Sequence, residues 1–214
     1  DTGQTLTVSG DIAWAAGDFI GSDSALSAHS FALTGDSFTS TNDVFTIGVS
    51  SNSNRTVFNI NGGTFTPGTG EVNIEEYSTS WSASYTKTLQ FDSAISFHKL
   101  TLAGGHSYSS RALTYIVAGT VVPSVTELFK WNGSHTYFYL TGTIEVSGNI
   151  ECASYGGANP DISSNGYPNP YATGLIKFTG TVDKTYTHIS GILPPLEIAC
   201  TAGKKLDCSG TTDV

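Results

Sequence analysis

The sequence has no methionine, only three cysteines and few charged residues. Charged side chains make up 13 % of the 214 residues, and the nine Lys and Arg are outnumbered by eighteen Asp and Glu, which gives a net charge of −9. An acidic surface repels nucleic-acid phosphates, and the adjacent basic pair Lys204-Lys205 is too small to offset this. We therefore expect no nucleic-acid partner.

Long apolar runs and helical periodicity are also missing. No stretch of 18 apolar residues is present, so we expect no membrane span. An apolar period of 3.6 residues nowhere persists beyond two turns, which argues against a substantial helical part. The sequence begins with Asp-Thr-Gly rather than Met. We interpret this as a mature form that has lost a signal peptide, and we expect a secreted or cell-surface location.

What the sequence does contain is Gly, Ser, Thr, Asn and aromatic residues arranged in short alternating bursts. Apolar and polar residues alternate in segments such as 45–49, 58–60, 72–74 and 144–146, and Gly- and Asn-rich segments such as 61–63 separate them. A period of two is the pattern of a half-buried β-strand. We predict one all-β domain over residues 1–214.

Two architectures are compatible with this spacing of bursts, which is roughly 11 to 17 residues in the first half of the chain. In a β-solenoid (parallel β-helix-like), each burst is one side of a coil and successive coils stack their strands in parallel. In a β-sandwich or jelly roll, the bursts are antiparallel strands. Two-residue hairpin turns are scarce, which favours the solenoid slightly, and both architectures stay open.

Several segments resemble the repeat units of bacterial extracellular parallel β-helix surface and adhesin-like proteins. The clearest is Gly-Thr-Phe-Thr-Pro-Gly-Thr-Gly-Glu-Val at residues 63–72, and residues 95–102, 174–182 and 193–198 are similar to further strands of such repeats. The resemblance implies an exported, repetitive surface or fibre protein without catalytic activity.

Residues 70–77, Gly-Glu-Val-Asn-Ile-Glu-Glu-Tyr, also resemble the catalytic strand of laminarinase-type jelly-roll glycosidases. That resemblance implies Glu71 as nucleophile and Glu76 (or Glu75) as acid, since retaining hydrolysis needs two carboxylates about 5 Å apart. Asn73 stands where the family has Asp. The competing interpretation is a strand whose acidic residues face solvent, and it leaves the chain with no catalytic residues.

A loop rich in Pro, Gly, Asn and Tyr is predicted at about residues 148–173. Loops of this length are often functional. Exposed aromatic rings beside polar side chains can stack on sugars, so the loop suggests a carbohydrate-binding, lectin-like module as an alternative function. The tyrosines that would contact a glycan are Tyr155, Tyr167 and Tyr171.

The same loop contains oxygen-bearing side chains suited to calcium, which accepts carboxylate, amide and carbonyl ligands. These residues are Asn159, Asp161 and Asn165. Ordinary turns capped by Asx side chains are the competing interpretation. No other cofactor is predicted.

Cysteines and glycosylation sequons complete the candidate sites. Cys200 and Cys208 are close enough in sequence to form a disulfide around a small loop, and Cys152 with Cys200 is the other pairing considered; either leaves one thiol. Asn54 and Asn132 begin Asn-x-Ser/Thr sequons and are candidate glycosylation sites.

These observations together favour a structural or adhesive protein over an enzyme. We expect a building block of a cell-surface layer or fibre that associates with other copies of itself through β-strand edges. The segment Thr5–Ile12 alternates apolar and polar residues at a chain end, which suits a strand donated to a neighbour. The carbohydrate-binding module and the glycosidase are the alternatives.

Overall fold

The computed structural model describes residues 4–79, 83–106, 112–133, 138–153, 173–190 and 193–208. These residues form β-strands and no helix, which confirms the predicted all-β class. Accordingly, this part of the chain has no helix that could cross a membrane.

The strands belong to three sheets, here named sheets A, B and C. Sheet A contains β1 (Thr5–Thr7), β4 (Ala25–Ala28), β7 (Val44–Ile47), β10 (Glu71–Ser78), β12 (Ser96–His106), β14 (Ser124–Gly133), β16 (Thr143–Val146), β17 (Asn149–Ala153), β18 (Leu175–Phe178), β19 (Lys184–Ser190), β20 (Leu196–Ile198) and β21 (Leu206–Asp207). Sheet B contains β2 (Asp11–Trp14), β5 (Ser30–Leu33), β8 (Arg55–Ile60), β11 (Tyr85–Phe91), β13 (Leu113–Gly119) and β15 (Phe138–Thr141). Sheet C contains β3 (Asp18–Ile20), β6 (Ser37–Thr39) and β9 (Thr64–Thr66).

Every ladder between these strands is parallel. From β1 to β9 the chain visits sheets A, B and C in turn, and from β10 to β15 it alternates between A and B. We call one such passage a circuit. Each strand therefore pairs with the strand one circuit away, not with the next strand of the chain. This pairing contradicts the antiparallel strands of the sandwich or jelly-roll alternative.

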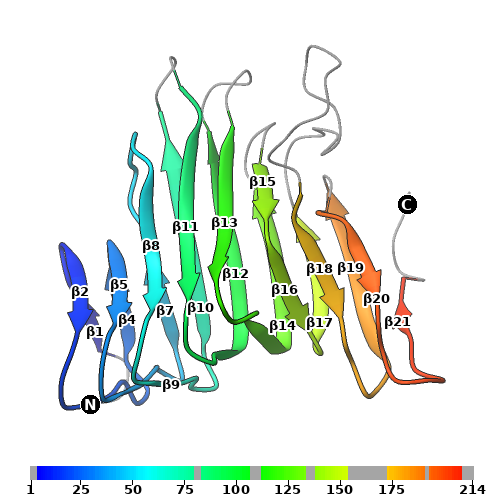
Figure 1. Ribbon diagram of the computed structural model, residues 1–214, viewed down its shortest axis with the longest axis horizontal. Coiled ribbons are helices and arrows are strands. Elements are labelled where there is room, and N and C mark those ends of the chain that lie inside the picture. Colours follow the sequence, from blue (N-terminus) through cyan, green and yellow to red (C-terminus); the bar gives the residue numbers. More distant parts are fainter. Residues whose placement is uncertain are drawn as a thin grey trace.

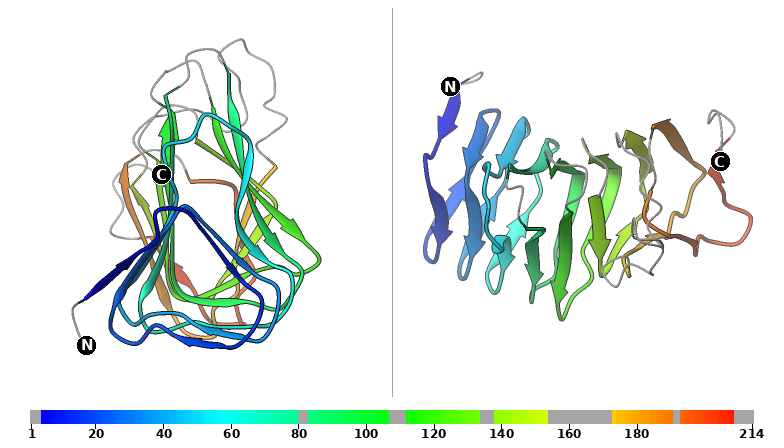
Figure 2. Two further views of the ribbon diagram at one scale, coloured as in Figure 1. Left: turned by 90° about the vertical axis from the view of Figure 1, so that its left-hand side faces the viewer. Right: turned by 90° about the horizontal axis from the view of Figure 1, so that it is seen from above.

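The circuits lie side by side along the long axis of the molecule. Figure 1 shows them in chain order, from β1 and β2 at the N-terminal end to β20 and β21 at the C-terminal end. Seen along that axis, the chain winds around a common interior, and the first circuit is the one nearest the viewer in the left panel of Figure 2. The two ends of the chain thus lie at opposite ends of the stack.

Side chains that point into the interior line up from one circuit to the next in three inward rows. Strands such as β4, β5 and β7 alternate half-buried and buried residues, so every second side chain enters a row. In sheet A the row runs Leu6, Leu26, Phe45, Val72, Leu100, Phe129. In sheet B it runs Ile12, Phe31, Phe58, Leu89, Val117, and in sheet C it runs Phe19, Phe38, Phe65.

Stacked aromatic rings fill the first circuits. The rings of Phe19 and Phe38 are 4.6 Å apart at 10°, and those of Phe38 and Phe65 are 6.0 Å apart at 14°. The ring of Phe31, in β5 of sheet B, lies 4.5 Å from the ring of Phe38, in β6 of sheet C. Such pairs stabilise the core beyond the burial of their apolar area. Aromatic contacts along the sheet C row therefore join one circuit to the next, and the contact of Phe31 with Phe38 joins two rows.

Neighbouring circuits approach each other closely at β10. Gly48 and Gly104 flank this strand with positive φ angles of 146° and 124°. A Cβ atom at either position would overlap a backbone carbonyl oxygen, that of Glu75 for Gly48 and that of Glu76 for Gly104. Glycine is required at these two points because any side chain would push the circuits apart.

The predicted loop at about residues 148–173 begins later than expected. Residues Asn149–Ala153 form β17, because Ile150 and Cys152 are buried and alternate with more exposed neighbours. Residues 154–172 lie outside the described part of the chain. The segment Thr5–Ile12, proposed above as a donated strand, instead supplies β1, which pairs with β4 of the same chain.

Candidate functional site

The N-terminal end of the stack leaves its apolar interior uncovered. Along the sheet A row, Leu6 is 49 % exposed, whereas Leu26 is 3 % exposed and Phe45 is fully buried. Ile12 and Phe19, which begin the other two rows, are likewise less buried than the residues that follow them. These residues are more exposed because the first circuit has a neighbouring circuit on one side only, although their side chains point inward like those that follow.

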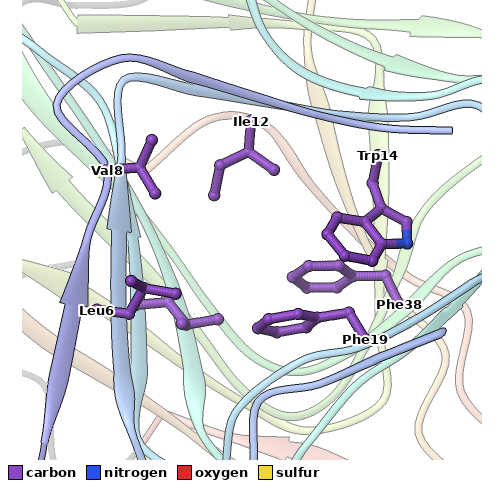
Figure 3. Close-up of a pocket in the computed structure, with 7 residues that line it drawn as sticks. Leu6, Val8, Ile12, Trp14, Phe19 and Phe38 are labelled. Carbon is purple, nitrogen blue, oxygen red and sulfur yellow. The ribbon is translucent and has the colours of Figure 1, made fainter. Parts of the chain in front are cut away.

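A hollow of about 120 Å³ opens at this end and is lined only by apolar residues. Figure 3 shows its lining side chains gathered around one space. The first circuit contributes Leu6, Val8, Ile12, Trp14 and Phe19, and the second contributes Leu26 and Phe38. Trp14 and Phe19 pack edge to face, 5.5 Å apart, at its side. We call this hollow, with the outer edges of β1, β2 and β3, the N-terminal end face.

Aspartates form the rim of the N-terminal end face. Asp11 accepts a hydrogen bond from Ser30 Oγ at 2.6 Å, and Asp18 accepts one from Ser37 Oγ at 2.5 Å. A carboxylate has further acceptor capacity after one such bond, and Asp11 and Asp18 are exposed. Arg55 Nη2 lies 3.9 Å from Asp11 Oδ1, and no Lys or Arg precedes Arg55 in the sequence.

The C-terminal end of the stack mirrors this exposure. β20 continues the inward positions of β18, pairing Leu196 with Ile176 and Ile198 with Phe178. Ile176 and Phe178 are fully buried, but Ile198 is 53 % exposed. We call the outer edge of β20, with Leu196 and Ile198, the C-terminal end face. Both ends therefore present apolar side chains that the interior of the stack would otherwise bury.

A cluster of charged residues lies inside the stack, near the middle of the chain. Glu76 of β10 and Lys87 of β11 have fully buried side chains and form an ion pair with 3.0 Å between Oε2 and Nζ. Arg55 Nε lies 3.7 Å from the other oxygen of Glu76. Lys87 Nζ also donates to the carbonyl oxygens of Ser51 and Ser53 at 3.2 and 3.0 Å. Besides each other, the two buried charges thus contact three groups: Arg55 and the carbonyl oxygens of Ser51 and Ser53.

Burial shifts the titration of this pair. It raises the pKa of the Glu76 carboxyl above its ordinary value, although Lys87 and Arg55 act in the opposite direction. It lowers the pKa of the Lys87 ammonium, which Glu76 partly offsets. In both residues the removal of water from the charged form is the largest cause.

Tyr115 lies beside this cluster and ties the two sheets together. Its hydroxyl contacts the carbonyl oxygens of Ile74 and Ala103 at 3.0 and 2.7 Å, which joins β13 of sheet B to β10 and β12 of sheet A. Burial raises the pKa of the Tyr115 hydroxyl well above its ordinary value. The cluster and Tyr115 therefore form an internal polar contact between the sheets.

The structure does not bring the proposed glycosidase carboxylates together. Glu71 is half-buried on the outer face of β10, whereas Glu76 points into the interior and pairs with Lys87. The two stand five positions apart, and side chains an odd number apart project from opposite faces of a strand. Glu75 shares the outer face with Glu71, but four positions along a strand correspond to about 13 Å. Neither pair has the separation that retaining hydrolysis needs.

The residues predicted for the carbohydrate and calcium sites belong to the segment 154–172. Tyr155, Tyr167 and Tyr171, and the proposed calcium ligands Asn159, Asp161 and Asn165, all lie outside the described residues. Within the described ranges, no group of three or more His, Cys, Asp or Glu side chains is arranged to hold a metal ion.

The two sequon asparagines differ in environment. Asn54 is exposed just before β8, and its Oδ1 accepts a hydrogen bond from the backbone N–H of Thr86. Asn132 is exposed near the end of β14. Both side chains reach the surface, as a glycosylation site requires.

The three cysteines form no disulfide in the structure, so the predicted Cys200–Cys208 bond is not present there. Cys152 is buried and its Sγ contacts the carbonyl oxygen of Ser190 at 3.4 Å. The Sγ of Cys200 contacts the carbonyl oxygen of Lys204 at 3.0 Å, whereas the Sγ of Cys208 contacts that of Leu206 at 3.7 Å. The two thiols are thus engaged with different backbone groups.

The sequence interpretation missed the two end faces and the buried pair. A signal for the pair existed, because Lys87 stands in the inward series Tyr85, Lys87, Leu89 and so is a charge on an apolar face. No such local signal exists for the end faces. Comparison of this chain with protein-family models, with curated proteins and with solved structures finds no match.

Proposed function

We propose that this chain is an extracellular structural or adhesive building block, a parallel β-solenoid that assembles with other copies through its strand edges into a surface layer or fibre. The observation that carries the proposal is the uncovered interior at the ends of the stack, most directly the difference in exposure between Leu6 and Leu26. Contiguous exposed apolar surface in a folded protein marks an interaction site.

The parallel sheets support the solenoid architecture in this proposal. The strands of sheets A, B and C stack in register over successive circuits, and their inward rows share one hydrophobic core. In a stack of this kind each circuit contacts only its neighbours, so the first and last circuits lack a neighbour on one side. A further circuit, from any source, would bury the same side chains that the existing circuits bury.

The composition supports a role outside the cell. The chain is rich in the uncharged polar residues Ser, Thr and Asn, and only 13 % of its residues are charged. The exposed sequon residues Asn54 and Asn132 would accept glycans in a host that glycosylates exported proteins.

Electron microscopy of the purified full chain, concentrated without denaturant, tests the proposal. Regular filaments or sheets are the expected result. Discrete single particles at every concentration would contradict assembly through strand edges, and glycan-binding assays of the full chain would then be the next measurement.

A further inference from the structure

We infer that the N-terminal end face binds the C-terminal end face of a second copy of this chain, in a head-to-tail stack that continues parallel sheet A across the junction. This inference rests on the proposed function and deepens it by naming the partner and the two surfaces. The observations behind it are strand direction, apolar fit and charge.

Strand direction permits the junction. Within the described residues no strand pairs with the outer edges of β1, β2 and β3, and β20 ends the series of sheet A at the other end. All ladders inside the molecule are parallel, as the pairings of β1 with β4 and of β18 with β20 show at the two ends. A copy placed head to tail presents β20 to β1 in this same direction. Each strand has three residues.

Prolines limit where the second copy can pair. Pro194 and Pro195 immediately precede β20, and proline has no backbone N–H to donate to a ladder. The edge available at the C-terminal end face is therefore the short segment Leu196–Ile198. β20 and β1 have the same length, so the ladder at one junction can pair both strands over their whole length.

Apolar residues at the two end faces complement each other. Leu6 and Ile198 occupy inward positions and are 49 % and 53 % exposed, whereas the residues beside them in the rows, Leu26 and Phe178, are almost completely buried. Side chains from the second copy would fill the hollow that Trp14 and the other lining residues surround (Figure 3). The junction thus removes from water the apolar surface that both ends leave exposed.

Charge selects the C-terminal end over a second N-terminal end. The first 54 residues contain six aspartates and no Lys or Arg, whereas the four basic residues that follow residue 172 are balanced by four acidic ones. Lys204 and Lys205 are exposed just before β21, and Lys205 Nζ lies 3.4 Å from Asp207 Oδ2. Two N-terminal end faces would place Asp11, Asp18 and their copies against each other, which like charges disfavour. The head-to-tail contact places the acidic N-terminal end against a part of the chain without excess charge and so avoids most of this repulsion.

The junction is heterologous, since it joins two different surfaces of the same chain. A heterologous contact that does not close into a ring generates an open filament. Figure 1 shows the two end faces at opposite ends of an extended stack, an arrangement that favours an open filament over a closed dimer.

A mixing experiment with two variants of the full chain tests this inference. Leu6→Asp removes the N-terminal end face and keeps the C-terminal one, and Ile198→Asp does the reverse. Val122→Asp is the matched control, because Val122 is 47 % exposed in the turn between β13 and β14, away from both ends. Circular dichroism and thermal unfolding establish that each variant folds.

Sedimentation velocity and native mass spectrometry, with one variant labelled with ¹⁵N, give the outcome. We expect loss of self-association in Leu6→Asp and in Ile198→Asp separately, a 1:1 heterodimer on mixing them, and assembly like that of the unmodified chain in Val122→Asp. Self-association of folded Ile198→Asp would indicate contact between two N-terminal end faces and overturn the inference. Monomers on mixing would overturn it as well.

The dependence on salt checks the charge argument. We expect folded Ile198→Asp, which keeps only the N-terminal end face, to be monomeric at low salt, where the repulsion between acidic rims is screened least. Self-association of this variant at low salt would contradict the charge argument. Filaments of the unmodified chain combined with no heterodimer would refute the head-to-tail junction and leave the proposed function standing. Single particles of the unmodified chain would refute both.

Discussion

The buried pair of Glu76 and Lys87 gives a quantitative prediction for Lys87→Met. Methionine keeps most of the aliphatic volume of lysine, so the substitution removes the charge and the donor with little loss of packing. After the change, Glu76 keeps only Arg55 as a nearby cation, at 3.7 Å. The carbonyl oxygens of Ser51 and Ser53 lose the donor that now lies 3.2 and 3.0 Å away.

The expected cost follows from these lost partners. Removing one member of a buried ion pair costs about 3–5 kcal/mol, because the other charge stays buried without compensation. Each unsatisfied buried carbonyl adds a penalty of about 1–3 kcal/mol unless water reaches it. We therefore expect Lys87→Met to lower the free energy of unfolding by about 5 kcal/mol, the upper end of the range for buried pairs.

Urea unfolding followed by tryptophan fluorescence measures this cost, and the chain offers a matched control. Lys177 and Glu145 pair at 3.2 Å, a distance close to that of the buried pair, but about a third of each side chain is exposed. An exposed pair contributes about 0–1 kcal/mol, so Lys177→Met should have little effect. The double variant Glu76→Leu, Lys87→Met should lose less stability than Lys87→Met alone, since it leaves no lone carboxylate. Equal costs for Lys87→Met and Lys177→Met would refute the reasoning.

Three further measurements test other parts of the structure. Burial raises the pKa of Glu76 in the folded protein, so the folded state holds the Glu76 proton at pH values where the unfolded state has lost it. The free energy of unfolding should therefore fall as pH rises above 4.5 through the folded pKa of Glu76. Urea titrations over this pH range should show no such fall in Glu76→Gln. Gly104→Ala should lower the free energy of unfolding by more than about 1 kcal/mol, because the added Cβ would overlap the backbone of β10. Gly10→Ala is the control: an added Cβ there has no atom within 4 Å, so the change in the same assay should be less than about 0.5 kcal/mol. A thiol reagent should modify exposed Cys208 in the native chain and buried Cys152 only after unfolding, and three reactive thiols in denaturant are expected; a single one would indicate a disulfide.

The all-β class could be predicted from the sequence because alternation is a local property. Segments such as 45–49 and 72–74 show period two, and they fall in or beside β7 and β10. The choice of neighbours could not be predicted in the same way, because pairing joins residues a whole circuit apart. Sheet C was missed entirely: β3 and β6 have three residues each, and a single inward phenylalanine is too little to define a period.

The buried charges show where a local pattern was available but was given the wrong meaning. Glu76 follows Val72 and Ile74 at spacing two, which places it on the inward face of β10. Resemblance to a catalytic strand drew attention to its carboxylate, and the same spacing excludes cooperation with Glu71. Lys87 occupies the equivalent inward position of β11. Two charges of opposite sign on inward faces of consecutive strands are a signal for an internal ion pair.

The end faces also explain how such a stack can assemble without aggregating at random. An exposed strand edge is a general hazard, and natural proteins protect edges with charges and prolines. Here Asp11 and Asp18 surround the N-terminal end face, and Pro194 and Pro195 shorten the C-terminal one. The acidic rim repels a second N-terminal end, and the prolines confine pairing to β20. The same features that limit non-specific association thus leave one orientation of two copies favourable, which gives a filament built in this way a defined polarity.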